Sequence, residues 1–270
     1  TQIGYQGLPV ETGIYPNPVH SSNVLGKIDH QFSGADQLSM RYALYDVTSA
    51  NARGVGNLNA PSGSTGLDNR DHSLAISNVW MISSNTVSES RVQIAHGDLQ
   101  AYSTDQIGPQ VTISGVATFG TFSSSPTRRE NTLYQAVSNV SHRAGAHALR
   151  AGVDFLLNDD TITFLRTFRG SYTFSSMANF LSGNYNGFAQ TFGDPVVNQK
   201  NPNVGVYAQD EWRANSRLTL NVGVRCDLQF LDTVNTDTNN LSPRAGFVWA
   251  PTASQDFLVR GGAGVFFDRV

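Results

Sequence analysis

The sequence predicts an all-β protein, an antiparallel up-and-down meander of about ten or eleven strands. Two observations support this prediction. Apolar and polar residues alternate along many segments, and the connections between these segments alternate between short and long. A period of two places apolar side chains on one face of a strand, whereas a helix would scatter them round its axis. Sorting of loop length by end is typical of outer-membrane barrels, so the meander is expected to belong to a transmembrane β-barrel.

The clearest alternation runs through residues 217–227. Its apolar face reads Leu218, Leu220, Val222, Val224 and Cys226. Its other face reads Arg217, Thr219, Asn221, Gly223, Arg225 and Asp227. These 11 residues match the length that a tilted strand needs to cross a bilayer. The segment is therefore predicted to be a spanning strand.

Nine further segments are predicted as strands. In chain order they are 23–32, 37–46, 72–82, 86–96, 130–142, 149–155, 203–213, 241–249 and 256–268, with an eleventh strand possible at 170–174. Tight connections are expected at Ser33–Asp36, Ser83–Asn85, Arg143–Ala146, Ala214–Ser216 and Ala250–Gln255. Three antiparallel hairpins follow from these turns. They pair 23–32 with 37–46, 203–213 with 217–227, and 241–249 with 256–268.

Long connections are expected at about 47–71, 97–129, 158–202 and 228–241. They are rich in Gly, Asn, Ser and Thr, a composition typical of exposed loops. The Gly-rich stretch 54–66 is read as a flexible loop, because it lacks the Lys-Ser/Thr pair of a phosphate-binding loop. A short helix is possible at Ser175–Ser182.

Tryptophans provide an independent indication of a membrane. Trp80, Trp212 and Trp249 each precede a tight turn by a few residues, and each lies on the more apolar face of its strand. If the tight turns share one end, these three girdle tryptophans form an aromatic belt at one membrane interface. The alternative is that they are three core tryptophans of a β-sandwich.

The apolar face is expected to meet lipid, and the polar face the barrel lumen. Residues predicted to point away from the barrel axis are Val153, Leu220, Val222, Val224 and Phe247. The predicted lumen-facing residues are Arg41, Arg91, Arg150, Asn221, Arg225, Arg244 and Arg260. In a soluble barrel or sandwich the same polar face would simply be solvated.

Composition and motifs argue against several classes of function. The net charge of −3 gives no reason to expect nucleic acid, and the single cysteine, Cys226, excludes a disulfide framework. The six histidines show no zinc-ligand spacing, so no metal or other cofactor is expected. No Gly-x-Ser-x-Gly elbow occurs, and we expect no enzyme activity. There is neither an apolar run of 18 residues nor a signal peptide.

Several segments resemble the barrel of TonB-dependent outer-membrane receptors. YAQDEWRANSRLTLNVGVRCD at 207–227 carries the resemblance most strongly, and LSPRAGFVWAP at 241–251 and VRGGAGVFFDR at 259–269 look like the next strands. The segments KIDHQFSGADQLSMRYALYD at 27–46, PQVTISG at 109–115 and HALRAGVDF at 147–155 resemble the Oar-like branch. The resemblance covers most of residues 24–270.

The resemblance implies a bacterial outer-membrane receptor for energised uptake of a large nutrient such as a siderophore, glycan or peptide. Its partners would be outer-membrane lipid, a plug domain, the TonB energy-coupling complex and the nutrient. Such barrels have about 22 strands. The resemblance therefore implies that residues 1–270 are part of a large transmembrane β-barrel, a partial barrel domain without plug or closing strand, forming an open sheet with two unpaired edges. The alternatives are a passive porin or adhesin-type barrel, and a soluble carbohydrate-binding β-sandwich.

Overall fold

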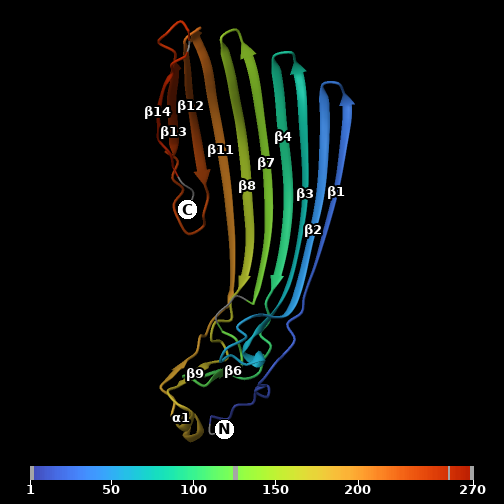
Figure 1. Cartoon of the computed structure of the whole chain (residues 1–270), viewed down its shortest axis with the longest axis vertical. Helices are drawn as coiled ribbons and strands as arrows, with labels where there is room; N and C mark the ends of the chain where they lie inside the picture. Colours follow the sequence, from blue (N-terminus) through green and yellow to red (C-terminus); the bar gives the residue numbers. More distant parts are fainter. Residues whose placement is uncertain (1–2, 124–126, 255, 268–270) are drawn as a thin grey trace.

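The computed structural model describes residues 3–123, 127–254 and 256–267. Its main feature is a curved ten-stranded sheet in the order β1-β2-β3-β4-β7-β8-β11-β12-β13-β14 (Figure 1). The strands are β1 Val19–Ser33, β2 Asp36–Arg53, β3 Thr65–Ser83, β4 Thr86–Gln100, β7 Arg128–Ala144, β8 His147–Thr163, β11 Val196–Asn215, β12 Leu218–Gln229, β13 Leu241–Trp249 and β14 Val259–Gly264.

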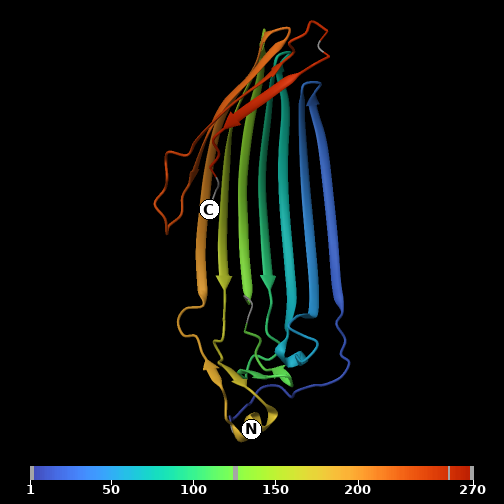
Figure 2. The same ribbon diagram turned by 60° about the vertical axis from the view of Figure 1, so that its left-hand side comes forward.

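Each strand pairs antiparallel with the next one of this sheet, which confirms the predicted meander. The three predicted hairpins are present as β1–β2, β11–β12 and β13–β14. Tight turns lie at one end of the sheet and long connections at the other, as both views show (Figure 2). The sorting of loop length by end is therefore a property of the fold.

The strand boundaries differ from the prediction in two ways. Most strands run further toward the long connections, and β2 and β11 reach 18 and 20 residues. Their loop-end parts are mostly polar on both faces, with exceptions such as the buried Val47, so the sequence there no longer alternates with a period of two. The last strand is shorter than the predicted 256–268. Strand β14 has only six residues, and its partner β13 has nine. Position 268 lies outside the described residues.

The sheet stays open. Among the described residues, β1 pairs only with β2, and β14 pairs only with β13. The two edge strands are therefore unpaired on their outer sides, as predicted. Because the ten strands form a single layer, apolar side chains on them remain accessible; Ile28 is 61% exposed and Val222 50%.

The long connections build a second sheet, which the sequence did not predict. Its strand order is β10 (Gly187–Ala189), β9 (Ser171–Phe174), β5 (Gln110–Ile113) and β6 (Ala117–Phe119). The strands β5 and β9 come from different connections and pair in parallel. Thus the segment 170–174, considered as an eleventh barrel strand, belongs instead to this loop sheet. The helix α1 (Met177–Ser182) confirms the expected short helix and is capped by the Ser176 side chain, which accepts from the Asn179 amide.

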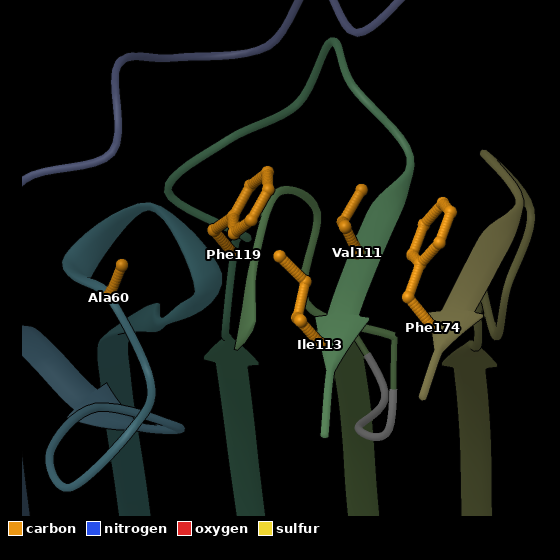
Figure 3. Packing of buried hydrophobic residues seen from close by; sticks show 5 residues of the cluster. All are labelled: Ala60, Val111, Ile113, Phe119 and Phe174. Carbon is orange, nitrogen blue, oxygen red and sulfur yellow. The ribbon is translucent and has the colours of Figure 1, made fainter. Parts of the chain in front are cut away.

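The buried hydrophobic cluster lies in this loop sheet (Figure 3). Val111 and Phe174 have no exposed surface, and Ile113 and Phe119 are 2% and 4% exposed. The ring of Phe180 from α1 packs edge-on against Phe119 and Phe174. The expectation that these connections are simply exposed loops is therefore wrong. The strands of the loop sheet are three or four residues long, too short to stand out among the surrounding Ser and Gly.

The stretch 54–66 is also packed. A turn of 3-10 helix spans Pro61–Gly63, and the side chains of Ser64 and Thr65 behind it are buried. The Ser64 hydroxyl donates to the Pro61 carbonyl over 2.6 Å and lies 2.9 Å from the Thr104 hydroxyl. These contacts tie the β2–β3 connection to the next long connection, so the interpretation as a free loop does not hold.

Candidate functional site

One face of the main sheet is polar and hollowed. Residues paired across neighbouring strands, and residues two apart on one strand, share a face. By this rule all seven predicted lumen-facing residues lie on one face: Arg41, Arg91, Arg150, Asn221, Arg225, Arg244 and Arg260. Two hollows open on this face. The larger is about 1000 Å³ and lies toward the tight turns, and the smaller is about 400 Å³.

Arg225 is held by two carboxylates on this face. Its Nη2 atom lies 2.6 Å from Asp154 Oδ2 and 2.7 Å from Asp227 Oδ1. Asp154 is on β8, two strands away from β12. The Arg225 side chain reaches it by crossing β11 at Gly205. A Cβ atom at Gly205 would lie 2.1 Å from Arg225 Nη2, so only glycine leaves room for this ion pair.

A second bridge repeats this arrangement one strand along. The Tyr207 hydroxyl on β11 donates to Asn139 Oδ1 on β7 over 2.8 Å, and crosses β8 at Gly152. A Cβ atom at Gly152 would lie 2.3 Å from that oxygen. Sequence reasoning did not pair Arg225 with Asp154 and Asp227, or Tyr207 with Asn139. A glycine in mid-strand, which signals close approach of another group, was the available indication.

The remaining predicted lumen-facing arginines of this face form no ion pair with any residue that the structure describes. Within the described parts of the chain, no carboxylate forms an ion pair with Arg41, Arg91, Arg150, Arg244 or Arg260. The Arg244 guanidinium instead lies over the Phe266 ring, 4.5 Å from its centroid. Five arginines of this face therefore lie outside its ion pairs, although the face also bears carboxylates such as Glu89, two residues from Arg91 on β4.

The opposite face is apolar over its middle. Val153, Val222, Val224 and Phe247 lie on it and are 39–50% exposed, and Leu220 shares the face as the partner of Phe247. A single-layer sheet cannot bury these side chains itself, so something else must cover them.

The three girdle tryptophans lie on this apolar face beside the tight turns, 41–48% exposed. Trp212 stacks on the His147 ring, with centroids 5.6 Å apart and an interplanar angle of 10°. The His147 Nδ1 atom lies 2.6 Å from Asp210 Oδ2. The Asp210 carboxylate on this face therefore has a partner at the tight-turn end. Likewise Asn78 donates to Asp36 Oδ1 over 2.6 Å.

Toward the loop end, the apolar face gives way to ion pairs. Arg70 pairs with Asp46 at 2.6 Å, and Lys200 pairs with Asp159 at 3.2 Å. Along β2, Asp36 and Asp46 bound the apolar stretch and are ten residues apart. At about 3.3 Å per residue and a strand tilt of about 40°, this stretch is about 25 Å tall, the height of the apolar band of a membrane barrel.

A buried carboxylate fastens the N-terminal segment to the loop sheet. Asp105 has no exposed surface and accepts four hydrogen bonds. Its Oδ2 atom accepts from the Tyr5 hydroxyl at 2.7 Å and the Leu8 amide at 2.9 Å, and its Oδ1 atom from the Ile107 and Gly108 amides. No sequence motif pointed to this residue. Gly7 makes the approach possible, because a Cβ there would lie 2.1 Å from Asp105 Oδ2.

The hydrogen bonds set the ionisation of this pair. Burial of Asp105 opposes its charged form, but the donors from Ile107, Tyr5, Gly108 and Leu8 outweigh burial and hold its pKa below the usual value. Burial, together with the hydrogen bond to Asp105 and its charge, raises the pKa of Tyr5. Asp105 therefore stays ionised and Tyr5 stays protonated across a wide pH range, as their hydrogen bond requires.

Comparison with known proteins agrees with this geometry. Residues 12–232 match a family described as an outer membrane beta barrel domain. The chain belongs to the outer-membrane β-barrel family. A comparison with curated proteins found no match.

Solved outer-membrane structures share the fold. The outer membrane transporter YddB from Escherichia coli matches with a TM-score of 0.64 and 14% identity, over 93% of this chain and 32% of YddB. FpvAI in complex with pyocin S2 matches with a TM-score of 0.56 and 11% identity, over 88% of this chain and 35% of that one. P. aeruginosa FpvA bound to heterologous pyoverdines gives 0.56 and 12%, over 88% and 34%. The chain thus spans about a third of the length of these structures.

Membership in this family places the chain in the bacterial outer membrane. It also excludes the soluble β-sandwich that the sequence left open. No helix in the described part of the chain is long and apolar enough to span a membrane. No group of three or more His, Cys, Asp or Glu side chains that could hold a metal ion occurs among the residues described.

Proposed function

We propose that this chain forms part of the barrel wall of a TonB-dependent receptor of the Oar-like branch. In this proposal residues 1–270 are a partial barrel domain. The parent receptor takes up a large nutrient, such as a siderophore, a glycan or a peptide, with energy supplied through the TonB complex. The role is one of binding and transport, without covalent chemistry.

The observation that carries the proposal is the open edge of the sheet. Membrane barrels can close with as few as eight strands. Here ten strands leave β1 and β14 apart, so the curvature belongs to a barrel with many more strands. A barrel of about 22 strands has a lumen that holds a plug. The sequence resemblance and the length of the matched transporter structures support the same size.

Each surface then has a role. The hollowed face with Arg41, Arg91, Arg150, Asn221, Arg225, Arg244 and Arg260 lines the lumen and meets the plug. The apolar face meets lipid, with the girdle tryptophans at the periplasmic interface. The loop sheet lies on the outer side, where its packed core holds several connections in fixed positions for the nutrient.

Energised uptake is tested in the native bacterium. Cells with and without the gene are given radiolabelled ferric siderophore, oligosaccharide and peptide mixtures, and each strain is tested with TonB present and depleted. The proposal requires uptake of at least one class that needs both the gene and TonB. Uptake that needs the gene alone would favour the alternative, a passive porin.

Channel conductance separates the alternatives further. The full-length protein in a planar bilayer is expected to be closed at rest, because a plug fills the lumen. A large, steady conductance would mean that the barrel is an unplugged pore. The matched control is the same protein after removal of any plug domain, which is expected to conduct.

A further inference from the structure

The larger hollow of the polar face carries a local excess of positive charge. It spans β4 to β13 near the tight turns and is lined by Arg143, Arg150, Arg225 and Arg244 and by Glu211. Arg225 is neutralised by Asp154 and Asp227, and Glu211 has Arg213 at 3.9 Å. The other three arginines have no carboxylate partner among the described residues. Asp210 offers none, because its carboxylate contacts His147 on the opposite face.

The spacing of the arginines indicates what can occupy the hollow. Arg150 on β8 and Arg244 on β13 lie on one line of paired residues, Arg150–Gln209–Gly223–Arg244. Three strand spacings of about 4.8 Å separate them by about 14 Å. The Arg244 side chain leans toward Phe266, beyond β13 and away from Arg150. A single small anion therefore cannot bind both guanidinium groups.

The floor between them admits a peptide. On the line between the two arginines, Gly223 presents backbone without a side chain, next to Gln209. An extended chain rises about 3.3 Å per residue, so two acidic residues about four positions apart would reach both arginines. Carboxylates also form strong, often bidentate hydrogen bonds with guanidinium groups.

We propose that this hollow docks an acidic, extended segment of the plug domain of the same protein. The inference rests on the proposed function, since it requires a plug. It goes beyond that function in naming the chemistry of the contact and its position on the wall. The docked segment neutralises three arginines beside the periplasmic turns that otherwise have no carboxylate partner among the described residues.

The experiment uses the full-length protein in outer-membrane vesicles. A photo-crosslinking amino acid replaces Gln209 in the floor of the hollow, and mass spectrometry identifies the linked peptide. We expect that peptide to come from the plug and to contain acidic residues four or five positions apart. The double variant Arg150→Glu/Arg244→Glu should lower the crosslink yield at least about tenfold, since like charges now face each other. The variant Arg150→Lys/Arg244→Lys should retain most of it.

A matched control keeps the result specific. Arg217→Glu reverses an exposed charge in a tight turn outside the hollow and should leave the yield unchanged. Heat-modifiable gel migration shows that each variant folds. A linked plug peptide without acidic residues, or an unchanged yield in the double reversal, overturns this inference and leaves the proposed receptor standing. A full-length protein with no plug, conducting at rest, overturns both.

Discussion

Replacing Asp105 by asparagine is expected to release the N-terminal segment from the loop sheet. The asparagine oxygen can still accept from the Ile107 and Gly108 amides, so the local turn persists. The NH₂ group of the new side chain, however, faces the Leu8 N–H. Both groups are hydrogen-bond donors, so no hydrogen bond forms between them. Two hydrogen bonds to a buried charge are lost, those from the Tyr5 hydroxyl and the Leu8 amide.

The size of the effect follows from these contacts. Each hydrogen bond to a charged group contributes about 1.5–3 kcal/mol, and the Tyr5 hydroxyl can recover about 1 kcal/mol by accepting from the new amide. A net loss of about 3 kcal/mol raises the undocked population of residues 3–8 on the order of 100-fold. Amide hydrogen exchange of this segment in the detergent-solubilised full-length protein measures that population. Asp232→Asn, an exposed aspartate of the β12–β13 connection, is the control.

The same contact predicts a pH dependence. Because the pKa of Asp105 is lowered in the folded state, its contribution to stability is present above the pKa of the unfolded chain. It is lost as the pH falls through the lowered folded value. The segment should therefore stay docked throughout neutral and mildly acidic pH and exchange faster only in strong acid. Equal exchange in Asp105→Asn and in the unchanged protein at neutral pH would refute the reasoning.

Three more predictions concern the main sheet. Val222→Arg should reduce the amount of folded, heat-modifiable full-length protein in the outer membrane, since an arginine facing mid-membrane costs about 2–4 kcal/mol. Asn221→Arg should not reduce it. The reverse result would mean that the two faces of the sheet are exchanged. Gly205→Ala should lower the free energy of unfolding in urea by about 2 kcal/mol, because it displaces Arg225 from Asp154. Gly26→Ala, where a Cβ meets open space, should have a much smaller effect. Equal losses in the two variants would contradict the Arg225–Asp154 ion pair across Gly205. Brominated lipids should quench the girdle tryptophans at one common, shallow depth, and quenching from the bilayer centre would contradict the belt.

The sequence was sufficient for the membrane-level part of the fold. Where one face meets apolar surroundings and the other polar ones, the period of two is imposed on every residue, as in 217–227. The tight turns then fix which strands pair. Toward the long connections, beyond the membrane-level part, both faces are mostly polar. The strands continue there, as β2 does to Arg53, without an alternating pattern that marks them in the sequence.

The loop sheet and the bridges were beyond sequence reasoning for a different reason. The core residues Val111 and Phe174 are 63 residues apart along the chain and belong to two connections that meet only in three dimensions. The partners of Arg225 depend on pairing register across three strands, which periodicity does not supply. Asp105 resembles any loop aspartate until its four donors are placed around it.

The parallel pairing of β5 with β9 limits how these connections can change during evolution. Loops on a barrel usually vary independently, because each is anchored only by its own two strands. Here the four residues Gln110–Ile113 must match Ser171–Phe174 of another connection, and both must keep the side chains of the shared core. An insertion is tolerated at the tips beyond these strands, but neither connection can be exchanged alone for that of a related barrel. Changes to this outer surface are therefore expected to arise by replacing the loop sheet as one inherited unit, or by substitutions on its exposed rim.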